Sequence, residues 1–506
     1  MRFRLADIPG ATAASLVVPA LVLVAGLLAG MVTAVIGSLA GDRAIYYVAV
    51  FGLIVFGGIV AVTRTEPLRF VFLALIACFP IADVIVPPGR LGLTVFPVVM
   101  IALTMGLIGK KLLASSKASE PLFPTPSLLI AWLFAVPCVV MSKYPSISLN
   151  AFIGIFAIYT FFLFALNELR RERGFERLVL LWSVVSLILA AGLFVDHFLH
   201  VSLSVQGNNL NQLAYAGSLE IYRAGGFFQD PQKGGAFLAC MITFLLVLSV
   251  RGRFRGMRMR FVVWAAIAVG SVALVTTISR SAILACLLVS GLALFAFNKW
   301  NAAAKLALMG SMVLLVIVMA LMPIETWRNI VPAAITERFV TLGKDLEVRR
   351  NIWFDTWNMF ADHPLAGIGL GSFRPFLIET RPTVFNFYGI ASERGVAYVP
   401  DQPESGYFKI LYEGGIAGSI AALLVAGDAL RRAAPIIAGS DSNPDARTEG
   451  IAALAALITF GLTFVTLFTV GDARVAAILA FLLAVVWHRS LSARAWYTEG
   501  LAVPRC

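Results

Sequence analysis

Residues 261–298 read FVVWAAIAVGSVALVTTISRSAILACLLVSGLALFAFN, two long apolar runs that are separated only by the turn Ser279-Arg280-Ser281. A helix needs roughly 20 apolar residues to cross the hydrocarbon core of a bilayer. The run at 261–278 and the run at 281–298 each approach this length. We therefore predict two membrane-spanning helices joined by a turn so short that Arg280 lies at or just below the membrane surface.

The same apolar character extends over the chain of 506 residues, of which 59% are hydrophobic and 13% are charged. This charged share is about half that of soluble domains and leaves too few polar residues to cover a surface exposed to water. Intrinsic disorder is excluded as well, because it requires low hydrophobicity. The composition predicts an all-α polytopic membrane protein. We predict about fourteen transmembrane helices, at 14–40, 44–62, 68–86, 91–108, 126–142, 147–167, 178–199, 234–250, 261–278, 281–298, 305–323, 411–428, 450–470 and 474–488.

The basic residues set the expected orientation, because cytoplasmic loops collect Lys and Arg. With the N-terminus inside, 24 of the 40 Lys and Arg residues fall in the inner segments. Both termini are then cytoplasmic, and the two long loops at about 200–233 and 324–410 are extracytoplasmic. The second of these loops lies between the eleventh and twelfth helices. The chain thus divides into N-terminal helices, a core that contains both long loops, and C-terminal helices with a cytoplasmic tail, at 1–200, 201–428 and 429–506.

Several function classes are disfavoured by the sequence. The net charge of +12 would suggest nucleic acid in a soluble protein, but basic loops explain it in a membrane protein. The five cysteines form no CxxC pair and the four histidines no cluster, so we predict neither a disulfide framework nor a metal site. ATP-driven transport is not expected, because no phosphate-binding GxxxxGK[ST] loop is found. The halves of the chain do not repeat, which weakens the case for an inverted-repeat transporter.

Arginine stands at the expected outer boundary in three places: Arg223 in YRAGGFFQDP, Arg280 in the turn, and the pair Arg349-Arg350 before Trp353. A single arginine at such a boundary more often reaches to lipid headgroups or anchors a helix end. That role explains Arg280 less well, because positive charge is disfavoured in short outer loops. The alternative is an anionic ligand, since guanidinium groups bind phosphate bidentately and stay charged at any accessible pH.

Two residues are candidates for acid–base chemistry. Glu404, in PESGYFKILYEGG (403–415), directly precedes the twelfth helix, where partial desolvation would favour a general base. A carboxylate that stabilises the helix N-terminus explains the same position equally well. His363, in DHPLAGIGLGSF (362–373), could exchange a proton near neutral pH, but a structural role in this glycine-rich turn is the favoured interpretation.

Four segments in this order, RAGGFFQDP, TISRSA, RNIW with DHPLAGIGLGSF, and ESGYFKILYEGG, resemble the O-antigen ligase and O-antigen polymerase superfamily of bacterial membrane glycosyltransferases. The resemblance covers roughly 205–425. It implies a fold of the lipid-dependent glycosyltransferase type with a periplasmic cap in the bacterial inner membrane. It also implies a donor glycan on undecaprenyl pyrophosphate and no cofactor, nucleotide sugar or essential metal.

The resemblance further assigns roles by position in the motifs. Arg223 and Arg280 would engage the pyrophosphate, Arg350 fits the arginine of RxxW better than Arg349 does, and a base in the last outer loop would activate the acceptor. The candidate catalytic residues are therefore Glu404, Arg280 and Arg223. The candidate substrate-binding residues are Arg350, Arg349, Asp230, His363 and Tyr407.

One departure from the family pattern bears on the reaction. Ligases that transfer glycan to lipid A core resemble HNxYLxxLxExG in this loop, and here Glu404 and Ser405 stand at the His and Asn positions before Tyr407. Because a carboxylate can also accept a proton, the change favours a polymerase of O-antigen or exopolysaccharide repeat units. The alternatives are an O-antigen ligase acting on lipid A core or another acceptor, and a transporter or flippase of anionic lipid-linked glycans. The expected partners are undecaprenyl-pyrophosphate-linked glycans and membrane lipids, with a chain-length regulator as a further candidate and no nucleic acid.

Overall fold

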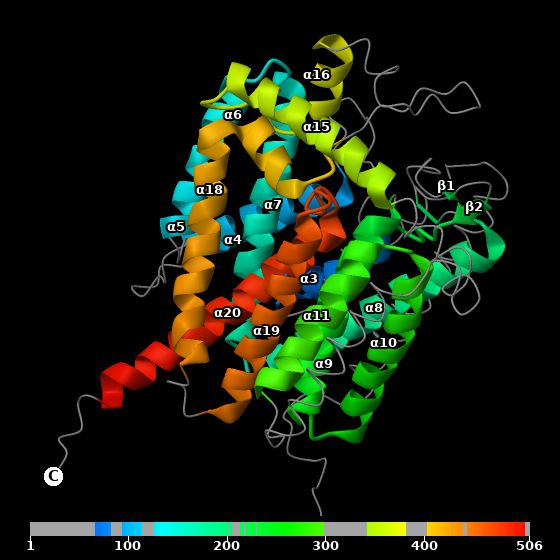
Figure 1. Cartoon of the computed structure of the whole chain (residues 1–506). Coiled ribbons are helices and arrows are strands. Elements are labelled where there is room, and N and C mark those ends of the chain that lie inside the picture. The colour runs from blue at the N-terminus through cyan, green and yellow to red at the C-terminus, as the bar shows by residue number, and fades with distance from the viewer. Residues whose placement is uncertain are drawn as a thin grey trace, which may run out of the picture.

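The computed structural model describes residues 66–81, 94–113, 126–201, 203–204, 213–216, 219–228, 230–297, 342–380, 402–438 and 443–500. These residues are almost entirely helical (Figure 1), in agreement with the predicted all-α membrane class. Seven of the described helices are long and apolar enough to cross a membrane. They are α7 (Pro145–Leu169), α8 (Gly174–Leu199), α9 (Pro231–Val250), α10 (Met257–Thr276), α18 (Gly406–Ile437), α19 (Pro444–Phe464) and α20 (Ala473–Gly500). The spans predicted at 14–40, 44–62 and 305–323 lie outside the described residues.

Shorter apolar helices lie within other predicted spans, which stay predictions: α3 (Pro67–Ala77), α4 (Val95–Leu113), α5 (Pro126–Phe134), α6 (Val136–Val140) and α11 (Arg280–Phe297), with a 3-10 turn at Phe79–Ile81. The span expected at 126–142 is broken between α5 and α6 at Ala135. Pro137 explains the break, because its ring removes a helical hydrogen bond and clashes with the preceding turn.

A two-stranded hairpin is the one sheet that the described residues form. β1 (Leu213–Ala216) pairs antiparallel with β2 (Leu219–Tyr222), with Leu213 opposite Tyr222. The hairpin lies within the long loop predicted at 200–233 and delivers the chain to the segment that carries Arg223.

Helix α9 forms the centre of the bundle. It contacts α10, α11, α19, α20 and α8, and most of its residues are buried, as expected for a helix that is apolar on all sides. Aromatic rings fill the space between helices. The ring of Trp182 on α8 lies 6.0 Å from that of Phe237 on α9 and 6.0 Å from that of Phe481 on α20.

Two helices lie at one end of the bundle: α15 (Leu342–Asp362) runs across it, and α16 (Phe373–Thr380) projects beyond it (Figure 1). Both belong to the long loop predicted at 324–410. The Nζ of Lys143, before α7, pairs with Glu379 at 2.6 Å and thereby ties α16 to the bundle. The end with α15 and α16 is called here the cap end.

Helix α18 is interrupted at Gly415, whose φ of 60° and ψ of −154° lie outside the helical region. A Cβ at this position would meet the Gly367 backbone nitrogen at 2.5 Å, so only glycine allows the approach. The interruption frees backbone N–H groups of α18, and these donate hydrogen bonds to the DHPLAGIGLGSF segment. For example, the Ile416 nitrogen donates to the Pro364 carbonyl oxygen at 2.8 Å. The buried carboxylate of Glu413 accepts the backbone N–H groups of Gly371 at 2.8 Å and Phe373 at 3.1 Å. The glycine-rich motif therefore packs against α18.

Charged side chains gather at the opposite end of the bundle. Glu168, 2% exposed at its side chain, accepts Arg69 at 2.8 Å and lies 3.2 Å from Arg177. Glu449, 1% exposed, pairs with Arg253 at 2.6 Å and also with Arg489. These bridges join α3, α7 and α8 in one place and the 251–256 loop, α19 and α20 in another.

Candidate functional site

Arg223 lies in the segment that leads from the hairpin into α9, and buried Asp196 fixes this segment. Asp196, near the end of α8, accepts the backbone N–H groups of Gly225 and Gly226 through Oδ2, each at 2.7 Å. Its other oxygen accepts the hydroxyl of Tyr222. Because these contacts lie on both sides of Arg223, the direction of its side chain is largely determined.

A second buried charge holds the next part of the same segment. The guanidinium of Arg474, at the start of α20, pairs with Asp472 at 2.7 Å and donates to the Phe227 carbonyl oxygen at 2.6 Å. It also lies over the ring of Phe228, 4.2 Å from the ring centroid. Thus α8 and the start of α20 hold the RAGGFF segment from two sides.

The turn between α10 and α11 adjoins Arg223. The Nε of Arg223 donates to the Thr277 carbonyl oxygen at 3.3 Å, and the Ala224 nitrogen donates to the Thr276 carbonyl oxygen at 3.2 Å. Ile278 has a φ of 50°, which is uncommon for a β-branched residue and marks a strained turn. Arg280 follows as the first residue of α11, so the turn sets Arg223 and Arg280 on neighbouring backbones.

The first half of α15 and the residues just before α18 complete the site. The Nη2 of Arg349 lies 3.2 Å from the Oε2 of Glu404, and both side chains are largely buried. The Nη1 of Arg349 donates to the Thr466 carbonyl oxygen at 3.1 Å, in the loop between α19 and α20. The hydroxyl of Thr466 bonds Ser281 at 2.8 Å, which links this pair to the Arg280 turn.

The electrostatic environment of Arg223 shows that four of the other predicted residues lie near it: Asp230, Arg280, Arg349 and Glu404. Burial lowers the pKa of the Arg223 guanidinium. The carboxylates of Asp230 and Glu404 act in the opposite direction, and the charges of Arg280 and Arg349 lower the pKa further. Arg223 still stays protonated at any accessible pH. It makes no ion pair within hydrogen-bonding distance among the described residues.

Three guanidinium groups and two carboxylates leave this cluster with one net positive charge. Asp230 uses its carboxylate to cap α9, where Oδ1 accepts the Gln232 nitrogen at 2.8 Å, which limits its freedom to act elsewhere. A partly buried cluster of arginines with excess positive charge is suited to an anion with several oxygens, such as a phosphate or pyrophosphate. Among the described residues, no three His, Cys, Asp or Glu side chains are placed to hold a metal ion.

The remaining sequence candidates, Arg350, His363 and Tyr407, have other surroundings. Arg350, which fits the RxxW spacing better, is exposed on α15, whereas its neighbour Arg349 contacts Glu404. His363 is exposed at the far end of α15, about 20 Å along the helix from Arg349 at about 1.5 Å per residue. Its ring packs edge-on against Phe376, in keeping with a role in the turn. The hydroxyl of Tyr407 donates to the Gly461 carbonyl oxygen at 3.0 Å.

Three charged residues that build the site have no predicted role: Asp196 and Arg474, which lie outside the motifs, and Glu413, which belongs to the ESGYFKILYEGG motif. Each is buried, and each bonds backbone groups of a motif. The sequence did hold a signal for them, because each is an ionisable residue within or beside an apolar span. Placing such a residue there costs free energy, so it is rare unless the residue has a partner or a function.

A family model described as O-antigen ligase matches residues 265–423. The matched segment contains Arg280, Arg349, Glu404 and the glycine-rich segment that packs on α18, whereas Arg223 precedes it. No curated protein matches the chain. The resemblance drawn from the motifs is confirmed by this match: over residues 265–423 the chain is similar to the O-antigen ligase family.

Proposed function

We propose that the protein is a polymerase of surface polysaccharide, O-antigen or exopolysaccharide, that transfers a glycan from undecaprenyl pyrophosphate to a hydroxyl of a lipid-linked acceptor. The observation that carries the proposal is the convergence of Arg223, Arg280 and Arg349 around Glu404. The family match supports chemistry on lipid-linked glycans in general. We place the site on the periplasmic face of the bacterial inner membrane.

In this proposal the arginines stabilise the leaving group. As the bond between the anomeric carbon and the phosphate oxygen breaks, negative charge develops on the pyrophosphate. Arg223 and Arg280 stabilise this charge in a site of lowered dielectric, where each preorganised donor contributes roughly 3–4 kcal/mol to the transition state. The buried Asp196 and Arg474 keep Arg223 in place, so the site needs little reorganisation during the reaction.

Glu404 is the general base of the proposal. It accepts the proton of the acceptor hydroxyl, whose oxygen attacks the anomeric carbon from the side opposite the pyrophosphate, so the anomeric configuration inverts. Arg349 orients this carboxylate through the 3.2 Å contact. General-base catalysis of this kind contributes typically ~10²–10⁴-fold.

A ligase is the second candidate, because the matching family model is described as O-antigen ligase. The two activities share the donor and the leaving group and differ in the acceptor. The carboxylate at 404, in place of the histidine of the ligase motif, favours the polymerase.

Purified full-length protein, reconstituted with lipid-linked repeat units alone, tests the proposal. A polymerase gives a ladder of lipid-linked products of increasing length and releases undecaprenyl pyrophosphate. We expect Glu404→Gln to lower turnover by roughly 10²–10⁴-fold while the unfolding midpoint stays near that of the wild type.

Two other outcomes would contradict the polymerase assignment. Product that forms only when lipid A core or another acceptor is added would make the protein a ligase. Movement of the intact lipid-linked glycan between leaflets, without any release of undecaprenyl pyrophosphate, would make it a flippase.

A further inference from the structure

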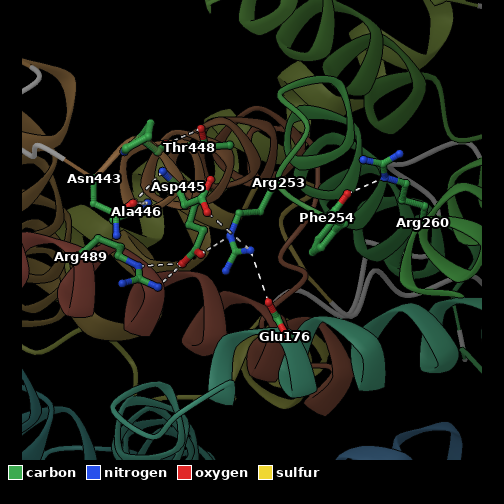
Figure 2. Close-up of polar contacts among 11 residues, drawn as sticks. Glu176, Arg253, Phe254, Arg260, Asn443, Asp445, Ala446, Thr448 and Arg489 are labelled. Atoms are coloured by element: carbon green, nitrogen blue, oxygen red, sulfur yellow. Dashed lines mark hydrogen bonds and ion pairs between the residues drawn. The ribbon is translucent and has the colours of Figure 1, made fainter. Parts of the chain in front are cut away.

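The segment Arg251-Gly-Arg-Phe-Arg-Gly-Met-Arg-Met-Arg260 joins α9 to α10 at the end of the bundle opposite the cap end. Its arginines divide into two groups. Arg251 and Arg253 face the bundle: Arg251 donates to the hydroxyl of Thr448 at 3.0 Å, and Arg253 pairs with Glu449 at 2.6 Å. Figure 2 shows Arg253 directed toward Glu176 and Asp445, with Arg489 on the other side of the network. These arginines have acidic or hydroxyl partners and fasten the loop to α8, α19 and α20.

The other three arginines are turned outward. Arg255, Arg258 and Arg260 are exposed, and none of them forms an ion pair with a described residue. The Nε of Arg260 donates to the Phe254 carbonyl oxygen at 2.5 Å (Figure 2). This contact fixes the Arg260 side chain without neutralising it. Three guanidinium charges within six residues of sequence therefore lack an acidic partner in the part of the chain that the structure describes.

The surface next to these arginines is apolar and follows one face of α10. Met257 is 82% exposed and Phe261 74% exposed. The exposed positions recur at intervals of three or four residues, which places them on a single helix face. They are Met257, Phe261, Trp264, Ala268, Val272 and Val275. The opposite face of α10 packs against α8 and α9.

This continuous apolar stripe indicates that lipid surrounds the arginines. In a helix that spans a bilayer, an exposed face of this composition contacts acyl chains. The 20 residues of α10 extend about 30 Å, close to the thickness of the hydrocarbon core. Because the stripe begins at Met257, the arginines on either side of that residue lie at the level of the lipid headgroups.

We propose that Arg255, Arg258 and Arg260 form a binding site for an anionic phospholipid, with the headgroup phosphate against the guanidinium groups and the acyl chains along Met257 and Phe261. Two features favour an anionic lipid over a zwitterionic one. The three charges have no acidic partner among the described residues, so a headgroup with net negative charge is attracted to all of them, and they would repel the ammonium group of a zwitterionic headgroup. The site lies about 30 Å from Arg280, on the far side of the hydrocarbon core. It is therefore separate from the candidate catalytic site.

Native mass spectrometry of the full-length protein tests the site. Detergent-solubilised protein is titrated with phosphatidylglycerol or with phosphatidylcholine of the same acyl chains. We expect the wild type to retain phosphatidylglycerol preferentially. The triple variant Arg255→Gln, Arg258→Gln, Arg260→Gln should lose about fivefold in affinity per arginine, on the order of 100-fold in all, because each cation near an anionic surface contributes about 1 kcal/mol.

Two control variants make the test specific. The corresponding triple Lys variant keeps the charges and should retain most of the preference. Arg374→Gln, which removes an exposed charge on α16 at the cap end, should leave the preference unchanged. The unfolding midpoint of each variant, measured without added lipid, confirms that the variants are folded.

The proposal is overturned if the folded triple Gln variant retains phosphatidylglycerol as the wild type does. It is also overturned if Arg374→Gln weakens retention equally, because the effect would then reflect overall charge. The same spectra report oligomers, and a dimer of the wild type that is lost in the triple Gln variant, without any lipid preference, would assign this surface to a second copy of the chain.

Discussion

Glu404 presents its carboxylate to Arg349 from a backbone with a φ of 51°. An L-residue with a side chain pays roughly 1–2 kcal/mol for the left-handed region, whereas glycine enters it freely. Such strain persists where the surrounding structure imposes it, and it is concentrated at functional sites. Ile278, in the turn before Arg280, also has a positive φ, so two strained residues border the same cluster.

A matched pair of variants separates the strain at Glu404 from its chemistry. Glu404→Ala and Glu404→Gly both remove the carboxylate, so both should lose turnover as Glu404→Gln does. Only glycine adopts the positive φ at this position without steric strain. We expect Glu404→Gly to be more stable than Glu404→Ala by about 1 kcal/mol, measured as a higher unfolding midpoint in detergent. Equal midpoints for the two variants would indicate that the φ at this position carries no strain.

Neighbouring arginines on α15 provide a second comparison at this scale. Arg349 contacts Glu404 and Thr466, whereas Arg350 is exposed. We expect Arg349→Ala to lower turnover by at least about tenfold, since hydrogen bonds to charged groups contribute roughly 1.5–3 kcal/mol. Arg350→Ala should stay within about threefold of the wild type. Steady-state turnover of lipid-linked repeat units gives the comparison, and the reverse order of the two variants would favour Arg350, as motif spacing does.

The same pair illustrates what motif spacing can and cannot predict. Spacing pointed to the α15 segment, but adjacent residues on a helix point about 100° apart, and only the packing of α15 decides which one faces inward. Arg223, Arg280 and Glu404 each lie in a short segment at a helix end, which limits where the side chain can point. The structure brings these three residues near one another, and their roles stay predictions.

At the scale of elements, the segment 222–228 depends on helices that are distant in sequence. Asp196 on α8 and Arg474 on α20 hold its backbone. Neither belongs to a motif, and the sequence does not reveal which buried charge meets which backbone amide. The division of the expected 126–142 span into α5 and α6 is easier to anticipate, because Pro137 in the sequence indicates a helix break.

Asp196 is predicted to act as a positioning residue for Arg223. In Asp196→Asn the amide group would meet the N–H groups of Gly225 or Gly226, and each buried donor left unsatisfied costs about 1–3 kcal/mol. We expect kcat to fall at least about tenfold with a smaller change in KM, because the misplaced guanidinium stabilises the leaving group less. Tyr222→Phe removes one contact of Asp196 and leaves both glycine contacts intact, so it should retain most activity. If both variants lower the unfolding midpoint and leave kcat unchanged, the role of Asp196 is structural only.

At the scale of the whole molecule, the two ends of the bundle have different chemistry. The cap end holds α15, α16, the strained turns and the arginine cluster around Glu404. The other end holds ion pairs between helix ends, such as Glu168 with Arg69 and Glu449 with Arg253. Arg69 and Arg253 belong to segments that the distribution of Lys and Arg assigns to the cytoplasm. The arginines of the cluster belong to segments that it assigns to the outer side. A bilayer that separates the two ends would leave the cluster facing the periplasm, where a lipid-linked glycan could reach it.

This orientation gives the last prediction. In a variant of the full chain without native cysteines, Arg374→Cys on α16 should react with a membrane-impermeant maleimide in intact spheroplasts. Arg255→Cys, at the end of the bundle opposite the cap end and just before the roughly 30 Å long α10, should react only after the membrane is disrupted. Both positions are exposed, so accessibility of the side chain is matched and only the side of the membrane differs. The reverse pattern would place the arginine cluster in the cytoplasm and remove the basis for a periplasmic polymerase. Reaction of both positions in intact cells would mean that α10 does not span the bilayer, which would also contradict the proposed lipid site at its first turn.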